Sequence, residues 1–349
     1  MYQLIPKPLL MQFNYVSRDF LEIDKLILMR EEELMDSGKR QGTIGVSLPD
    51  GVEKRWIRDL AAMEKEAKEK GAFLKSEVSN NVFANQDTKV DKLLSEGISI
   101  LIIAPTDSVA AASIVDKAHK VNVKVIAYDR IIKNSDVDLY VTFDSQRVGE
   151  IQGQYLTKTA PKGNYIILTG DPEDNNSALL LKGAMEFIQP LVTQREIKIV
   201  TNMPVLNWDP KNAYKIVADS LKDNKNNINA ILAPNDAIAG AAIDALKEQG
   251  LAGKVIVTGQ DADVDAAKRI VQGTQAMTVF KDTRALGAAA IDAAIKLSEG
   301  KALDLSGTTN NGKIEVPSIL LDSVAVTKDN LEAILINSGF IKKSDVFTT

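Results

Sequence analysis

Three strand-like runs of this chain end on polar side chains, an arrangement suited to binding a polar ligand. The runs and the residues at which they stop are KVIAYDR with Asp129, INAILAPND with Asn235, and KVIVTGQD with Asp261. In a parallel α/β sheet, ligands bind in the crevice beyond the carboxyl ends of the strands. Because the three ends come from distant parts of the sequence, we expect them to converge on one buried polar site.

The two tryptophans of the chain stand in or beside predicted loops that follow strands. Trp56 belongs to the run PDGVEKRW, and Trp208 belongs to the run MPVLNW. An aromatic face with a polar edge is suited to stacking on the C–H face of a sugar. The alternative is that each ring packs its loop onto the core.

Charged and amide side chains stand at equivalent places near strand ends. The cations are Arg55, Arg130 and Lys281, and the acceptors and amides are Asp129, Asn176, Asn235 and Asp261. Sugar hydroxyls donate and accept hydrogen bonds at once, so charged donors and carboxylate acceptors together can bind a ring of hydroxyls. For any single residue, a surface ion pair or a helix N-cap is an alternative, and Asn235 and Asp261 could simply cap the helices that follow them.

Other chemistries are disfavoured by composition. One histidine and no cysteine exclude histidine-based triads, multi-histidine metal sites, thiolate sites and disulfides. The run DADVD at 261–265 resembles the start of a calcium loop, but Ala266 and Gln272 stand where its glycine and glutamate should be. Paired carboxylates could also suggest a glycosidase, although the surrounding donors suit enclosure of a ligand better. We therefore expect no catalytic residue, no metal and no cofactor.

The elements that must position these residues alternate between strand and helix from Gly42 onward. A first series has strands at 42–48, 72–78, 98–105, 124–128 and 139–143, with helices near 53–70, 86–95 and 108–120. A second series has strands at 164–170, 197–205, 229–235, 254–260 and 275–281, with helices near 146–158, 177–189, 210–222, 237–249 and 263–272. Near-continuous apolar strands separated by helices predict an α/β fold of two Rossmann-like lobes with parallel sheets.

The C-terminal part of the chain predicts a hinge between the lobes. A helix at 284–300, a Gly/Asn-rich loop at 306–312, a strand at 316–322 and a helix near 327–338 follow the second series. We expect the first lobe to comprise 42–144 and 283–314, and the second lobe to comprise 145–282 and 315–345. The chain would then cross between the lobes near 142–146, 277–284 and 313–320, with the ligand cleft beneath this hinge.

Residues 1–41 form a separate N-terminal extension, predicted to be one amphipathic helix. It carries six basic and seven acidic residues, whereas a DNA-binding headpiece should be basic. The net charge of −5 for the whole chain also gives no reason to expect nucleic acid as a partner. The apolar side of the helix could dock a partner or tether the protein to a membrane, and the alternatives are packing on its own lobe or a disordered leader.

Seven runs of the sequence resemble one family. The runs GVEKRWIRD, VIAYDR, TFDSQRVGE, GDPEDNNSALLLKGA, APNDAIAGAAIDAL, TGQDAD and GTQAMTVFKD are similar to the bacterial D-xylose-binding proteins, of the ribose/galactose-type (type I) periplasmic binding proteins. The resemblance extends from about 42 to 345 and implies a sugar held between two lobes and two tryptophan rings. The contacts that it implies are Arg55, Trp56, Asp129, Arg130, Asn176, Trp208, Asn235, Asp261 and Lys281.

The resemblance also implies partners and a location. The ligand would be D-xylose, and the receiver would be an ABC permease or the extracellular domain of a membrane sensor histidine kinase. The protein would then work outside the cytoplasm, in the periplasm or on the outer face of the membrane. The alternatives are a binding protein for another monosaccharide such as ribose, or a transcription factor of the lactose-repressor type.

Overall fold

The computed structural model describes residues 42–347 apart from Val52. These residues fold as one unit, distinct from residues 1–41. The helix predicted within 1–41 lies outside the described residues. No helix within the described part combines the length and the apolar character needed to cross a membrane.

The first lobe is built on a seven-stranded sheet. Its strands are β1 (Ile44–Leu48), β2 (Leu74–Val78), β3 (Ile100–Ile103), β4 (Lys124–Tyr128), β5 (Leu139–Phe143), β11 (Gly307–Asn310) and β12 (Glu315–Leu321). They lie in the order β11-β12-β5-β4-β3-β1-β2, and neighbours are parallel except for β11 and β12. Strands β1, β3 and β5 are buried along their whole length, which explains why they read as continuous apolar runs.

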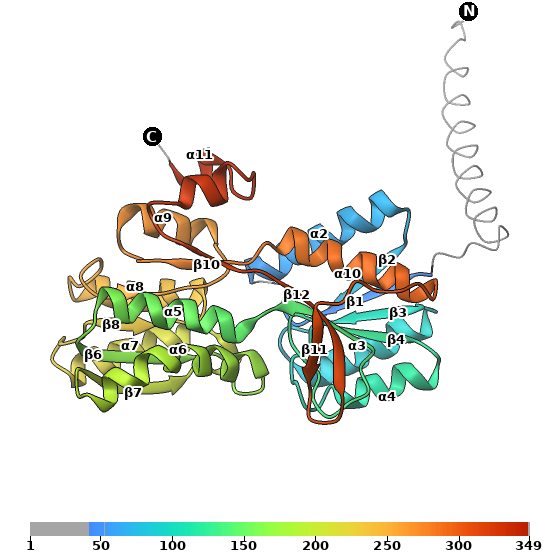
Figure 1. Ribbon diagram of the computed structural model, residues 1–349, viewed down its shortest axis with the longest axis horizontal. Coiled ribbons are helices and arrows are strands. Elements are labelled where there is room, and N and C mark those ends of the chain that lie inside the picture. The colour runs from blue at the N-terminus through green and yellow to red at the C-terminus, as the bar shows by residue number, and fades with distance from the viewer. Residues whose placement is uncertain (1–41, 52, 348–349) are drawn as a thin grey trace, which may run out of the picture. The chain divides into compact units, whose positions relative to one another are not determined.

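Helices cover both faces of this first sheet (Figure 1). Helices α2 (Lys54–Lys70) and α10 (Thr283–Ser298) pack on one face, and α3 (Phe83–Ser95) and α4 (Ala112–Lys120) pack on the other. Gly71 ends α2 with a left-handed backbone, φ 71°, a conformation that glycine adopts without strain.

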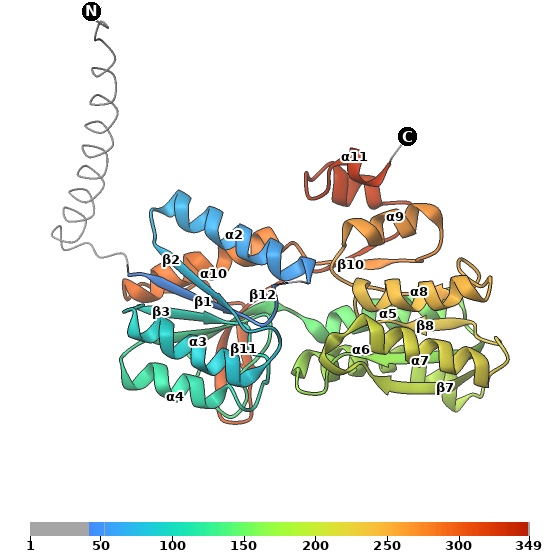
Figure 2. The ribbon, with the colours of Figure 1, turned by 180° about the vertical axis from the view of Figure 1, so that it is seen from behind.

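The second lobe has a four-stranded parallel sheet. Its strands are β6 (Gly163–Thr169), β7 (Ile197–Pro204), β8 (Ala230–Leu232) and β9 (Ile256–Val257). They lie in the order β7-β6-β8-β9. Helices α5 (Ser145–Thr159) and α6 (Asn175–Thr193) cover one face, and α7 (Pro210–Asp223) and α8 (Asp236–Glu248) cover the other, as Figure 2 shows from behind.

The remaining elements complete the second lobe. They are the 3-10 turn η1 (Leu206–Trp208), α9 (Val264–Gln272), β10 (Thr278–Phe280), β13 (Val324–Val326), the π-helical segment η2 (Glu332–Ile336) and α11 (Lys343–Val346). β10 pairs antiparallel with β13. A shared apolar cluster joins α9 to the C-terminal segments.

The expected architecture of two α/β lobes with three connections is present, but three local expectations were wrong. The strand expected at 316–322 in the second lobe is β12, which pairs with β5 in the first lobe. The expected loop at 306–312 contains the edge strand β11. The strand expected at 275–281 is β10, which lies outside the four-stranded sheet. The helix expected near 327–338 is present as the π-helical segment η2.

The connections follow β5, β10 and β12. The third therefore lies at 322–323, slightly beyond the expected region. We propose moving the boundary between the lobes accordingly, so that β12 belongs to the first lobe.

Candidate ligand-binding site

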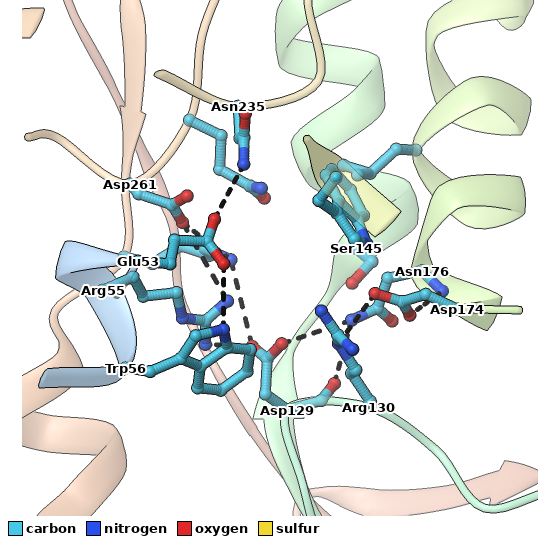
Figure 3. Close-up of a pocket in the computed structure, with 14 residues that line it drawn as sticks. Glu53, Arg55, Trp56, Asp129, Arg130, Ser145, Asp174, Asn176, Asn235 and Asp261 are labelled. Atoms are coloured by element: carbon cyan, nitrogen blue, oxygen red, sulfur yellow. Dashed lines mark hydrogen bonds and ion pairs between the residues drawn. The ribbon is translucent and has the colours of Figure 1, made fainter. Parts of the chain in front are cut away.

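The structure brings all nine predicted site residues together around one pocket between the lobes (Figure 3). Five further residues line it: Glu53, Ser145, Asp174, Leu180 and Gln260. The polar members come mainly from the carboxyl ends of β4, β6, β8 and β9 and from the start of α2. This is the edge at which parallel sheets bind ligands.

Three ion pairs form the charged wall of the pocket. Arg55 pairs with Asp129, Arg130 pairs with Asp174 at 2.8 Å, and Lys281 pairs with Asp261 at 3.2 Å. All six side chains are less than one-tenth exposed. Three cations therefore face three carboxylates, and this set carries no net charge.

The Arg55–Asp129 pair is supported by a second layer of buried groups. Asp59 accepts a hydrogen bond from Arg55 Nε at 3.1 Å and another from the Tyr128 hydroxyl. Burial alone would raise the pKa of Asp129, but the nearby Arg55 and Lys281 outweigh it and lower the pKa to about 2. Asp129 is thus held as an anion that can accept hydrogen bonds.

Three site residues that follow strands have a positive φ. Asp129 has φ 60°, and its carbonyl accepts hydrogen bonds from the Tyr140 and Thr142 hydroxyls, both at 2.8 Å. Asp261 has φ 97° and Trp208 has φ 54°. Non-glycine residues in this region cluster at functional sites, where the surrounding structure must hold them.

The lobes touch one another across the pocket. Asn176 Nδ2 of the second lobe donates to the Asp129 carbonyl of the first lobe at 3.1 Å. The Arg130–Asp174 pair also joins the two lobes, as does the bond from Ser108 N to the Glu173 carbonyl at 3.0 Å. The described conformation is therefore closed around the pocket.

The two tryptophans have different environments. Trp56 is 2% exposed, and the guanidinium groups of Arg55 and Arg130 lie 4.5 and 5.3 Å from its ring centroid. Trp208 is half-buried, and its ring packs against Gly170, where any side chain would collide with it. Both rings line the pocket.

Three buried polar atoms of pocket-lining residues have no hydrogen-bond partner among the described residues. They are Asn176 Oδ1, Trp208 Nε1 and Asp261 Oδ1, and the last of these forms the ion pair with Lys281 at 3.2 Å. A buried polar group without a partner costs about 1–3 kcal/mol, so such groups call for an explanation. An acceptor and a donor at the wall of one pocket are suited to a ligand that both donates and accepts.

Of Asn235 and Asp261, which could each have capped the helix that follows, only Asn235 does so. Asn235 Oδ1 accepts from Ile238 N at 2.9 Å and caps α8, while its Nδ2 faces the pocket and donates to Glu53 at 3.0 Å. Asp261 is not the cap of α9, because Asp263 occupies that position. Asn235 therefore serves the helix and the pocket together.

The carboxylates of the DADVD run are engaged with cations. Asp261 pairs with Lys281, Asp263 with Arg58 at 2.9 Å, and Asp265 with Lys54. Within residues 42–347, no group of three or more candidate ligands is arranged to hold a metal ion. The geometry gives no reason to assign this run to calcium.

Sequence reasoning missed Glu53, Asp174 and Gln260. Asp174 stands two residues before Asn176 in the run DPEDNN, and it accepts a hydrogen bond from Asn176 N at 2.9 Å. Glu53 lies three residues before Trp56, and Gln260 directly precedes Asp261. Adjacency to chosen residues was the only available signal, because sequence does not give the direction of a side chain.

The pocket is small in this conformation and adjoins a larger groove. Its cavity volume is about 20 Å³, room for about one water molecule. The groove has a volume of about 750 Å³ and shares Glu53 and Trp208 with the pocket. A ligand larger than water can enter only if the lobes separate or lining side chains move.

Two α/β lobes that enclose a polar pocket and are joined by three connections define a two-lobed binding protein. Residues 44–302 match the family model described as a periplasmic binding protein domain. The chain therefore belongs to the periplasmic binding protein family, whose similar members named below are binding proteins and not enzymes.

Similar proteins include two that are named D-xylose-binding periplasmic protein. The one from Haemophilus influenzae is 38% identical over 87% of this chain and 92% of its own length. The one from Escherichia coli K12 is 39% identical over the same two shares. Among solved structures, a carbohydrate transporter solute-binding protein from Chloroflexus aurantiacus in complex with D-glucose is 35% identical, with a TM-score of 0.83, and covers 87% of this chain and 98% of its own.

Proposed function

We propose that this chain binds D-xylose in the pocket between its lobes. The observation that carries the proposal is the charge-neutral set of three buried ion pairs beside two tryptophan rings. A charged ligand would leave this set with an uncompensated charge, which is costly in a buried site. An uncharged polyol can accept from the cations and donate to the carboxylates without that cost.

The unpartnered atoms and the aromatic rings support a sugar among uncharged ligands. Asn176 Oδ1 can accept from a hydroxyl, and Trp208 Nε1 can donate to one. The faces of Trp56 and Trp208 can cover the C–H faces of a pyranose ring. We propose that all nine predicted residues contact the sugar.

The choice of D-xylose rests on relatives and on size. The two relatives at 38–39% identity are named for D-xylose. A pentose lacks the hydroxymethyl group of glucose, so it requires less expansion of the pocket than glucose does. D-glucose is the competing ligand, because a similar solved structure at 35% identity is a complex with it.

The proposed mechanism is closure of the lobes on the sugar. Xylose enters when the lobes are apart, and closure brings Asn176, Asp174 and Asn235 of the second lobe to the ligand and to the first lobe. The sugar shifts this equilibrium only by its higher affinity for the closed form. The closed surface then reports that sugar is bound.

We further propose that the protein works outside the cytoplasm and that a membrane partner recognises the closed form. An ABC permease and the extracellular domain of a sensor histidine kinase are the two candidate receivers. The relatives named as periplasmic proteins favour this over a lactose-repressor-type transcription factor. Co-purification with membrane proteins in the presence and absence of xylose distinguishes the two receivers.

Intrinsic fluorescence tests the binding proposal, because both tryptophans of the chain line the pocket. Adding D-xylose should change the emission in a saturable manner, and D-ribose should produce the change only at much higher concentration. Trp208→Phe should reduce the change in emission, which would show that the Trp208 ring is responsible for it. No saturable change with D-xylose, together with a change on adding D-glucose, would contradict the pentose assignment.

A further inference from the structure

Glu53 is a fourth carboxyl group in a pocket whose other charges are already balanced. It stands directly before α2, and its side chain makes no capping hydrogen bond to that helix. Instead, its Oε2 accepts from Trp56 Nε1 at 2.9 Å and its Oε1 accepts from Asn235 Nδ2 at 3.0 Å (Figure 3). The side chain therefore extends into the pocket and bridges the two lobes.

Both donors that Glu53 engages belong to the set proposed to contact the sugar. Trp56 lies in the first lobe and Asn235 in the second, so the carboxyl group connects the same two walls that a bound sugar would connect. With Glu53 in place, the cavity has a volume of about 20 Å³, which is too small for a pyranose.

We propose that the Glu53 side chain is an internal competitor of the sugar, which satisfies Trp56 and Asn235 in the empty pocket and must withdraw when sugar binds. This inference rests on the proposed sugar-binding function. It assigns Glu53 a role in setting affinity and not in holding the ligand.

The groove beside the pocket provides the place to which Glu53 withdraws. Glu53 lines both cavities, and the groove has a volume of about 750 Å³. Rotation about side-chain bonds can therefore move the carboxyl group from one cavity to the other. Because the side chain does not cap α2, this rotation breaks no helix hydrogen bond.

The charges that face Glu53 make its position depend on pH. Burial, together with the nearby carboxylates of Asp261 and Asp263, raises the pKa of Glu53 to about 7 against the opposing effect of Arg130 and Arg55. Lys281 and Asp129 line the same pocket and offset one another in charge. The neutral carboxyl group is thus stable in the pocket, whereas the ionised group favours the solvent-filled groove.

Competition should therefore be strongest at acidic pH. If the pKa is about 7 in the pocket and near the ordinary value of about 4.3 in the groove, xylose affinity should be lower at pH 6 than at pH 7.5 by up to about eightfold, the limit reached when Glu53 occupies the empty pocket at both pH values. The sign follows because sugar binding releases the proton that the empty pocket retains.

Titration calorimetry with D-xylose at pH 6 and pH 7.5 tests this with Glu53→Ala and Glu53→Gln. Glu53→Ala removes the competitor and should bind xylose with the same, high affinity at both pH values. Glu53→Gln is the matched control: its carbonyl oxygen can still accept from either Trp56 or Asn235, and it cannot ionise, so its affinity should be the same at both pH values. The wild-type affinity should move toward that of Glu53→Ala as the pH rises from 6 to 7.5.

Two results would overturn the inference. One is weaker binding by Glu53→Ala than by wild type at both pH values, which would make Glu53 a sugar contact. The other is the same change with pH in Glu53→Gln, which would assign the titration to another group. Circular dichroism of both variants checks that α2 and the fold are intact. If the wild-type protein fails to bind D-xylose, the proposed function fails first, which distinguishes the two claims.

Discussion

Replacing Asp174 by Asn should weaken xylose binding without weakening the fold. Asp174 lies at the start of α6 in the second lobe, and it pairs with Arg130 of the first lobe at 2.8 Å. Asn is as good an N-cap as Asp, so the bond from Asn176 N at 2.9 Å and the helix should be retained. What is lost is the charge that faces Arg130 across the cleft.

The size of the effect follows from the burial of the pair. Arg130 and Asp174 are 4% and 3% exposed, so water cannot replace the missing charge in the closed form. Burial raises the pKa of Asp174 although Arg130 lowers it, which means that the pair does not recover all of its desolvation cost. We therefore use the range for one hydrogen bond to a charged group, about 1.5–3 kcal/mol, which weakens binding roughly 10- to 150-fold.

Calorimetric titration with D-xylose measures the affinity, and urea unfolding measures the stability. The matched control is Asp144→Asn, since Asp144 caps α5 through Arg147 N at 3.0 Å but is exposed and outside the pocket. The control should bind xylose as the wild type does. Wild-type affinity in Asp174→Asn would refute the idea that this pair helps to hold the lobes closed on sugar.

Three further predictions concern the aromatic wall, pH and the N-terminal extension. Trp208→Ala should cost about 2–4 kcal/mol of xylose affinity. Gly170→Ala should also weaken binding, because its methyl group would collide with the Trp208 ring. Calorimetry measures both affinities, and unchanged values would contradict the stacking role. The free energy of unfolding in urea should fall as pH rises from about 5 to 8, because burial raises the pKa of Asp236 to about 8 and that of Glu53 to about 7; a flat or rising profile would contradict these shifts. Deleting residues 1–40 should leave xylose affinity within about twofold, or about 0.4 kcal/mol, because every pocket-lining residue lies between Glu53 and Lys281; loss of binding would place the extension within the folded lobe.

The location of the site was predictable from the sequence, because apolar runs show where parallel strands end. Asp129 and Asp261 follow apolar runs, and parallel strands deliver their carboxyl ends to one edge. That rule places residues in a region without fixing where their side chains point. Glu53 and Asp174 were therefore not predicted, because the sequence does not show that their side chains point into the pocket.

The sequence predicted the strands that have a local apolar pattern. It did not predict features that depend on pairing between strands far apart in the sequence. Strands β1, β3 and β5 are buried on both faces and read as apolar runs. The segment GTTN of β11 has the composition of a loop, and it is a strand because it pairs with β12 at the sheet edge. The lobe to which β12 belongs depends on its pairing with β5, which is far away in sequence.

Calorimetric titration of the wild-type protein with D-xylose, D-glucose and D-ribose tests the central claim most directly. We predict binding of D-xylose with a dissociation constant of about 10⁻⁶ M or tighter, near −8 kcal/mol, and much weaker binding of the other two sugars. The basis is that a buried polar wall left unpaired by a misfitting sugar loses about 1–3 kcal/mol for each group. Equal affinity for D-glucose and D-xylose, or no heat with D-xylose, would contradict the account.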